Sequence, residues 1–265
     1  MAKNKSRRRA LITGISGQDG AYLSKLLLEQ GYEVFGGLRR SATRNLWRLD
    51  ELGLTEKIRL VDFELSEFSN ILNTIRDIKP HEIYNFASNS DVAVGHRQPL
   101  YTGEVDALGV TRILEAIRIN DDSIRFYQAS SSEMFGNTSI APQSELTPFQ
   151  PHSPYGIAKL YAHWTTVNYR EAYNIFATSG ILYNHESPLR GTEFVTRKVT
   201  SGLAKIRNGQ ADCINLGNLD AERDWGHASD YVRGIWQMLQ QPEPDDFVLA
   251  TGELHGLRDL VTLAA

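Results

Sequence analysis

The sequence predicts an α/β fold: a Rossmann-like doubly wound parallel sheet with a smaller, interleaved C-terminal region. Three observations predict it. Short apolar runs alternate with segments of helical period, which is the pattern of βαβ units. A glycine-rich turn from Gly14 to Gly20 separates the first apolar run from the first amphipathic segment. Polar clusters follow several apolar runs, and the carboxyl ends of parallel strands are where open α/β sheets bind ligands.

The first half of the chain supplies most of the expected sheet. Residues 21–30 place Leu23, Leu26 and Leu27 on one helix face, and Gly31 ends that helix. Ser66 is expected to cap a helix that continues through Asp77. We expect strands at residues 10–13, 33–38, 58–63, 82–86 and 125–130, and a further helix at 106–119.

The second half is less regular. Residues 137–154 are rich in Pro, Ser, Thr and Gln, which predicts a long loop before a helix that carries Tyr155 and Lys159. Beyond Leu182 we expect a helix to residue 208, then a segment at 223–230 and another helix. This pattern predicts a larger domain at 1–183 and a smaller region with returning sheet elements at 184–265. The last helix, 257–265, has no closing element, so we expect a truncated C-terminus.

Composition narrows the class of protein. The chain has 265 residues, 41% of them hydrophobic and 23% charged, with a net charge of −4, which gives no signature of nucleic-acid binding. No stretch approaches the ~20 apolar residues of a membrane span. The single cysteine, Cys213, fits a reducing compartment, and the basic run from Lys3 to Arg9 is expected to be a solvated tail. We therefore expect a cytoplasmic protein whose partners are small molecules or other subunits.

The glycine-rich turn predicts a dinucleotide site. Gly14, Gly17 and Gly20 lie between an expected strand and an expected helix. In that position, backbone amides can approach a pyrophosphate at the positive end of the helix. The turn therefore indicates a bound dinucleotide.

The choice between NAD and NADP is read at the end of the second strand, where an acid would bind a ribose 2′-hydroxyl. This chain has Arg39, Arg40 and Ser41 there, a set that suits a 2′-phosphate. NADP is therefore favoured over NAD. We accordingly expect residues 1–183 to be mainly the NADP-binding domain and residues 184–265 to be mainly the substrate-binding region. Glu64 and Leu65 are expected near the adenine, and residues 86–90 near the pyrophosphate and ribose.

Two segments carry the predicted chemistry. Tyr155 and Lys159 are four residues apart, so they share a helix face, and the ammonium can stabilise a phenolate that acts as a base in hydride transfer. Ser131 and Glu133 follow the fifth strand at the same sheet edge. A plain reductase needs no carboxylate there, but a carboxylate can remove the proton beside a new carbonyl and assist loss of a hydroxyl. Glu133 therefore points to elimination.

Two cations farther along, Lys198 and Arg223, are candidates for contact with a diphosphate, although a solvated surface role fits each equally well. Trp225 and His227 are interpreted as packing residues. No metal site is predicted.

With these residues in view, the chain resembles the extended short-chain dehydrogenases and, within them, the GDP-mannose 4,6-dehydratase family. The resemblance runs from Ala10 to about Leu260. Its most specific segments are residues 14–20, 131–136, 153–161, 184–188, 194–198, 216–220 and 223–226.

The resemblance implies a mechanism. Tyr155, assisted by Lys159, would deprotonate the C4 hydroxyl of GDP-mannose while hydride passes to NADP⁺. Glu133 would then remove the C5 proton and assist water loss from C6, with Ser131 polarising the C4 oxygen, and the hydride would return to C6. The product would be GDP-4-dehydro-6-deoxy-D-mannose, a precursor of GDP-fucose or GDP-rhamnose.

The resemblance also implies a set of binding residues and a homodimer or homotetramer. The implied cofactor contacts, together with the glycine turn, are Gly14, Ile15, Ser16, Gly17, Gln18, Asp19, Gly20, Arg39, Arg40, Ser41, Ala42, Glu64, Leu65, Phe86, Ala87, Ser88, Asn89, Ser90, Tyr101, Lys159, His185 and Arg190. The implied contacts with the GDP-sugar are Ser90, Asn184, Lys198, Asn218 and Arg223.

Three positions depart from the family pattern. Ser131 replaces a threonine, Glu64 replaces an aspartate, and Ser88-Asn89-Ser90-Asp91 stands where Ala-Gln-Ser and a bulky residue are usual. The family also continues several dozen residues beyond Ala265. Two alternatives therefore stay open: a related enzyme, such as a dehydratase of GDP-manno-heptose, an epimerase or a reductase, and a catalytically weak NADP-binding assembly protein.

Overall fold

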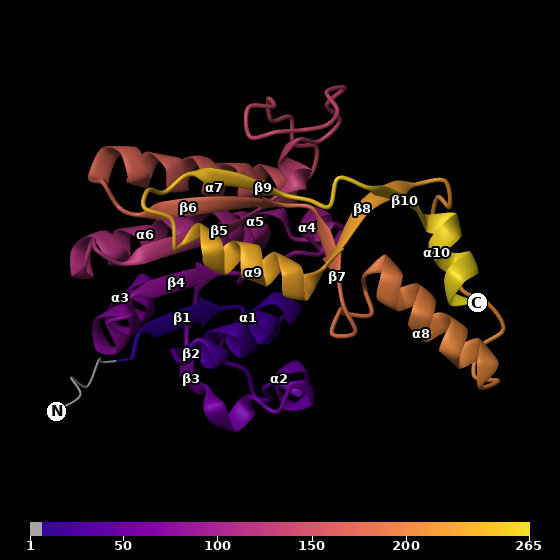
Figure 1. The fold of residues 1–265 in the computed structure, drawn as a ribbon, viewed down its shortest axis with the longest axis horizontal. Coiled ribbons are helices and arrows are strands. Elements are labelled where there is room, and N and C mark those ends of the chain that lie inside the picture. Colours follow the sequence, from indigo (N-terminus) through magenta and orange to yellow (C-terminus); the bar gives the residue numbers. More distant parts are fainter. Residues whose placement is uncertain (1–6) are drawn as a thin grey trace.

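Seven parallel strands form the central sheet in a computed structural model that describes residues 7–265 (Figure 1). The strand order reverses between β1 and β4, so a topological switch point lies between them. In spatial order the strands are β3 (Arg59–Asp62), β2 (Glu33–Leu38), β1 (Arg9–Thr13), β4 (Glu82–Asn85), β5 (Arg125–Ser131), β6 (Ala177–Leu182) and β9 (Asp246–Leu249). The predicted fold class is confirmed.

Helices cover both faces of this sheet and bury two separate cores. On one face, α1 (Gln18–Glu29), α2 (Trp47–Glu51) and α9 (Ala228–Met238) contribute Leu27, Leu49 and Ile235. On the other, α3 (Phe68–Ile78), α6 (Gly109–Asn120) and α7 (Pro154–Tyr173) contribute Ile71, Ile113 and Ala162. Each large apolar side chain buried in this way contributes roughly 1.5–3 kcal/mol. The cores hold the strands, and therefore the loops at their carboxyl ends, in place.

Local signals set where the helices begin. Pro154 is the first residue of α7, and the Ser153 hydroxyl accepts a hydrogen bond from the Gly156 amide at 3.0 Å. The prediction that Ser66 caps α3 is wrong: the cap is Glu67, whose carboxylate accepts from the Ser69 amide, while the Ser66 hydroxyl donates to Glu64. α1 begins after Gly17 without any side-chain cap, so its first amides stay free for a ligand.

A smaller sheet lies at one end of the large one. Its order is β10 (Leu254–Gly256), β8 (Glu222–His227) and β7 (Asn184–Glu186), and α10 (Leu257–Ala264) contacts α8 (Val195–Arg207) (Figure 1). The chain reaches this sheet twice, because β9 returns to the large sheet beside β6. The division at residue 183 stays a prediction.

The expected helix at 106–119 is preceded by several short elements. The α4 (Val92–Arg97) and α5 (Pro99–Thr102) turns lead into a π-helix, η2 (Gly103–Leu108), and regular α-helix begins only at Gly109. Two single-turn 3₁₀ helices, η1 (Thr55–Lys57) and η3 (Ser132–Met134), precede β3 and follow β5. Single-turn π-helices are rare and often mark functional sites.

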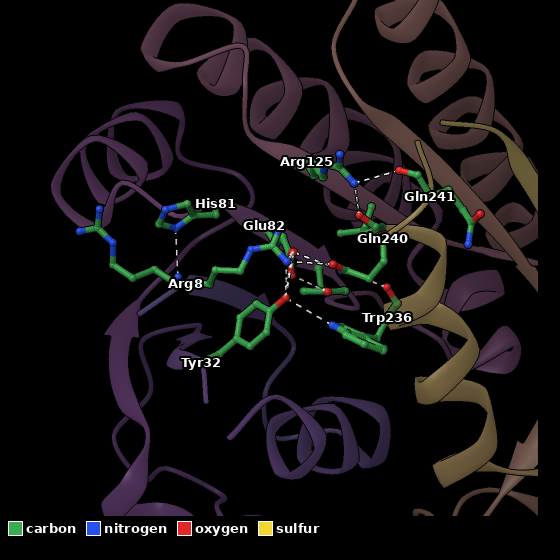
Figure 2. A network of polar contacts seen from close by, with 11 residues as sticks. Arg8, Tyr32, His81, Glu82, Arg125, Trp236, Gln240 and Gln241 are labelled. Atoms are coloured by element: carbon green, nitrogen blue, oxygen red, sulfur yellow. Dashed lines mark hydrogen bonds and ion pairs between the residues drawn. The ribbon is translucent and has the colours of Figure 1, made fainter. Parts of the chain in front are cut away.

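The amino ends of the strands are joined by a polar network around Glu82, the first residue of β4 (Figure 2). The Glu82 carboxylate is fully buried and accepts from the hydroxyls of Tyr84 and Tyr32 and from the amide of Gln240, at 2.8, 3.1 and 3.2 Å. The Arg8 guanidinium lies 3.3 Å from the same carboxylate. This network ties β4 to β2 and to the end of α9.

The N-terminal tail was predicted to reach Arg9, but Arg9 begins β1 and Arg8 belongs to the Glu82 network. The rest of that predicted tail lies outside the described residues. Within residues 7–265, no helix has both the length and the apolarity needed to cross a membrane.

Candidate active site

A cavity of about 780 Å³ opens at the carboxyl ends of the central strands. Its wall is formed by the glycine turn after β1, the loops after β2, β3, β4 and β5, the start of α7 and the segment that includes β7. Most of the predicted site residues line it: Gly14, Ser16, Gly17, Gln18, Asp19, Gly20, Arg39, Glu64, Leu65, Phe86, Ala87, Ser88, Asn89, Ser90, Tyr101, Ser131, Glu133, Tyr155, Lys159, Asn184, His185 and Arg190.

The glycine turn is folded too tightly for other residues. Gly14 has φ +67°, and a Cβ on it would lie 2.7 Å from the Ala87 amide nitrogen. A Cβ on Gly20 would lie 2.7 Å from the Gly14 carbonyl oxygen. The backbone can therefore approach a ligand closely, and the free amides at the start of α1 fit a pyrophosphate. Ile15 does not line the cavity, because its side chain is fully buried behind the turn.

The residues predicted to recognise a 2′-phosphate divide into two groups. Arg39 lines the cavity and donates to the Tyr101 hydroxyl at 2.6 Å. Arg40, Ser41 and Ala42 are exposed and are not part of the cavity wall. Of these four residues, only Arg39 lies in the cavity wall.

Tyr155 and Lys159 lie on the first two turns of α7 and are both buried. The Lys159 ammonium donates to the Ala129 carbonyl at 2.9 Å and lies 5.5 Å from the centre of the Tyr155 ring. Burial lowers the pKa of Lys159, and the negative charge of Asp106 opposes that shift. The shared helix face is as predicted from the spacing.

The pKa of Tyr155 differs from the expected direction. Burial raises it above its usual range, the charge of Asp106 raises it, a side-chain hydrogen bond with Ser131 lowers it, and the charge of Glu133 raises it again. Loss of solvation thus outweighs the help that Lys159 was expected to give. The protein alone holds Tyr155 as a phenol, and a positive charge brought by a ligand would favour the phenolate.

Ser131 and Glu133 lie where β5 gives way to η3. The Ser131 hydroxyl accepts from the Glu133 amide at 3.2 Å, and Glu133 is exposed to the cavity. The start of α7 packs against this turn, since a Cβ on Gly156 would lie 2.8 Å from the Glu133 carbonyl oxygen. A hydroxyl, a carboxylate and a phenol therefore face one space.

His185 joins the nucleotide turn to the smaller sheet. Its two ring nitrogens lie 2.8 Å from the Tyr183 carbonyl and 3.0 Å from the Asp19 carboxylate, so both face acceptors. Burial lowers the pKa of His185, but the charge and hydrogen bond of Asp19 and the bond to Tyr183 outweigh it and leave the pKa raised. The imidazolium form satisfies both acceptors.

Arg48 was not predicted from the sequence. It lines the cavity from α2 and donates to the carbonyls of Leu189, at 2.6 Å, and of Ser16, at 2.9 Å. It thereby bridges the nucleotide turn and the loop after β7. Nothing in the local pattern distinguishes Arg48 from a surface arginine, because its partners are 32 and 141 residues away.

Three predicted substrate contacts lie outside the cavity wall: Lys198, Asn218 and Arg223 are exposed and do not line it. The Asn218 side chain accepts from the Asp220 amide, and the Arg223 guanidinium donates to the Glu222 carbonyl. Among residues 7–265, no group of three His, Cys, Asp or Glu side chains is arranged to hold a metal ion.

Comparison with solved structures agrees with this architecture. A UDP-glucose 4-epimerase of Thermotoga maritima, solved with UDP-glucose, matches 97% of this chain and 81% of its own with a TM-score of 0.86 and 21% identity. A dTDP-glucose 4,6-dehydratase of Streptomyces venezuelae, solved with NAD, matches 97% and 80% with a TM-score of 0.85 and 20% identity. At these identities the likeness establishes the fold.

Sequence comparison is more specific. The family described as GDP-mannose 4,6 dehydratase matches residues 11–265. Relatives with that name are 51% identical in Cricetulus griseus, over 98% of this chain and 72% of the relative, and 51% identical in Homo sapiens, over 97% and 71%. A GDP-mannose 4,6-dehydratase of Vibrio cholerae is 50% identical over 98% and 72%. The chain belongs to the GDP-mannose 4,6-dehydratase family.

Proposed function

We propose that this protein dehydrates GDP-mannose to GDP-4-dehydro-6-deoxy-D-mannose. The observation that carries the proposal is the presence of Glu133 in the same cavity wall as Tyr155 and Lys159, in a chain of this family. An epimerase or a reductase has no need of an eliminating carboxylate. The relatives named as GDP-mannose 4,6-dehydratases support this choice of reaction.

The cofactor is a nicotinamide dinucleotide, and specifically NADP. The tight glycine turn and the free amides of α1 suit its pyrophosphate, and Arg39 suits a 2′-phosphate. Solved structures of the same fold contain NAD, which supports a nicotinamide cofactor. The choice of NADP is supported by Arg39.

The first half of the reaction is an oxidation. Tyr155 removes the proton of the C4 hydroxyl, and Lys159, on the same helix face, lowers the energy of the phenolate. The nicotinamide cofactor, which the glycine turn and Arg39 would hold, would supply the acceptor of the C4 hydride, the later hydride donor to C6, and a positive charge that favours the phenolate.

The second half is an elimination. The new 4-keto group acidifies the C5 hydrogen, Glu133 takes that proton and then protonates the departing C6 hydroxyl, and Ser131 donates to the C4 oxygen. The C5=C6 bond that results would take the hydride at C6 and a solvent proton at C5. Electrons balance within one turnover, so no external reductant is consumed.

Assembly and location stay predictions. We propose a homodimer or homotetramer in the cytoplasm, supported by family membership for the first and by the single cysteine for the second.

The proposal is tested by incubating the purified protein with GDP-mannose and NADP⁺ and following the 4-keto sugar. We expect its formation with no net appearance of NADPH, and GDP-manno-heptose as a slower substrate. Bound NADP⁺ without 4-keto sugar would refute the proposal. Glu133→Gln should cut kcat by about 10²- to 10³-fold at nearly unchanged NADP⁺ affinity, whereas full activity would assign the C5 base to another group.

A further inference from the structure

One buried acid beside the catalytic helix has no part in the reaction as described above. Asp106 is only 2% exposed and lies in the π-helix η2, which packs against α7. Burying a carboxylate is costly unless it is paired or hydrogen-bonded. The groups that surround Asp106 therefore indicate its role.

The hydrogen bonds of Asp106 fix its carboxylate. One oxygen accepts from the Asn89 backbone amide at 2.8 Å, and the other accepts from the Ser88 hydroxyl at 3.0 Å. Burial raises the pKa of Asp106, whereas the charge of Lys159 and the hydrogen bonds from Asn89 and Ser88 oppose that shift and favour the ionised carboxylate. Both donors come from the loop after β4, which lines the cavity.

Asp106 differs from Glu104 in the charged groups around it. Glu104, the other acid of η2, is paired with Arg112 of α6. Tyr101 of α5 is held by Arg39. The charge of Asp106 acts on two titratable groups of α7: it raises the pKa of Lys159, which favours the ammonium, and it raises the pKa of Tyr155, which favours the phenol. In the described chain, Lys159 forms no ion pair, and its ammonium donates to the neutral Ala129 carbonyl.

Lys159 is therefore a buried cation whose hydrogen-bond acceptor carries no charge. It is 3% exposed, and burial alone would favour loss of its proton. A neutral Lys159 would not stabilise a phenolate. Some negative charge must hold the ammonium, and Asp106 is the acid whose charge opposes the effect of burial on Lys159.

We propose that ionised Asp106 is a positioning residue of the active site, the fixed negative charge that keeps buried Lys159 an ammonium while its two hydrogen bonds anchor the Ser88–Asn89 loop. It touches no reacting atom and acts through Lys159. The Ser88 hydroxyl supplies the second hydrogen bond of this anchor.

The test replaces the charge while keeping the shape. In Asp106→Asn, kcat for dehydration should fall about 10- to 100-fold with the KM for GDP-mannose changed less than about threefold, and the alkaline limb of the kcat profile, where Lys159 loses its proton, should move to lower pH. The matched control is Glu104→Gln, which removes the other negative charge of η2, one that is paired with Arg112; its kcat should stay within about threefold of the wild type. Equal losses in both variants without a shift of the limb would overturn the proposal.

The kinetic measurements rest on the proposed function. A second measurement is therefore added that does not depend on it. The titration of Lys159 is followed by NMR in protein labelled at the lysine ε-carbon, with the resonance assigned by Lys159→Arg. The titration should move to lower pH in Asp106→Asn and hardly at all in Glu104→Gln. An unmoved titration would overturn the proposal even if the protein dehydrates GDP-mannose, and a moved titration would support it even if it does not. If Asp106→Asn fails to fold, Asp106→Glu, which keeps the charge, should preserve the wild-type titration, and its loss would contradict the proposal.

Discussion

The two ends of the parallel sheet bury a carboxylate in different ways. At the amino ends, Glu82 is fully buried among donors from β2, β4 and α9 and faces Arg8 (Figure 2). At the carboxyl ends, Asp106 receives two hydrogen bonds from one loop and acts on a cation that it does not contact. The first arrangement satisfies a charge locally; the second leaves its field available to Lys159.

Buried tyrosines show the same contrast. The Tyr84 hydroxyl donates to Glu82, and burial together with that carboxylate raises its pKa, so it stays a phenol. Tyr155 is also a phenol in the protein alone, but it faces a cavity that a charged ligand can enter. The comparison teaches that a buried tyrosine becomes a base through what shares its cavity, since burial alone works against it.

The largest difference is expected when one tyrosine hydroxyl is removed at each end of the sheet. Tyr155→Phe should lower kcat by about 10³-fold or more, because the C4 proton loses its acceptor, with NADP⁺ affinity and Tm little changed. The matched variant Tyr84→Phe should leave kcat within about twofold and cost about 1 kcal/mol of stability. Steady-state kinetics and denaturant unfolding measure both. Comparable activity in the two variants would remove Tyr155 from the chemistry.

The next effect belongs to the amino end. Glu82→Ala should lower the free energy of unfolding by about 3–5 kcal/mol, because Tyr84, Tyr32 and Arg8 lose their shared acceptor in a buried site. The kcat of the folded fraction should not change, since the cavity lies at the other end of the strands. Denaturant unfolding measures the loss. A loss below about 1 kcal/mol would show that water replaces the carboxylate.

A smaller effect is expected in cofactor choice. Arg39→Ala combined with Arg40→Ala should weaken NADP⁺ binding by about tenfold or more, through loss of charge-assisted hydrogen bonds, and weaken NAD⁺ binding far less. Arg44→Ala is the control, because Arg44 is exposed in the same loop and pairs with Asp62. Titration of binding by calorimetry compares the two nucleotides. Equal losses for NADP⁺ and NAD⁺ would refute a 2′-phosphate contact.

The smallest effect concerns His185. Its pKa in the folded protein is raised, so its contribution to stability is fully present below the unfolded value, about 6.5, and is lost as pH rises through the folded value. Unfolding measured from pH 6 to 9 should show the wild type losing this share with rising pH. Asp19→Asn removes the main attraction and should flatten the slope. An unchanged slope would mean that His185 is neutral in the folded protein.

How much the sequence predicts depends on how local the cause is. The strand Glu33–Leu38 has the bounds predicted from its apolar run. The helix with Tyr155 and Lys159 begins where the polar loop before it was predicted to end. The cap of α3 is not predicted correctly, because serine is the better cap by residue type, while Ser66 instead donates to Glu64 and leaves Glu67 as the cap.

The site shows the same limit. The glycine turn and Glu133 can be recognised in the sequence by residue type and spacing. Arg48 and Asp106 cannot, because the residues that they contact lie elsewhere in the sequence. Lys198 and Arg223 were selected for charge alone, and charge does not say which face a helix or strand presents. Burial of Tyr155, which reverses the expected direction of its pKa, is a property of the packed fold.

In the proposed mechanism, one cavity carries out oxidation, elimination and reduction within one turnover. The most direct measurement uses GDP-mannose with deuterium at C4, turned over in ordinary water, with the product examined by NMR and mass spectrometry. This mechanism predicts that the deuterium is recovered at C6 of the same sugar and that C5 carries a solvent proton. Loss of the deuterium from the product, or its accumulation in the cofactor pool, would contradict it.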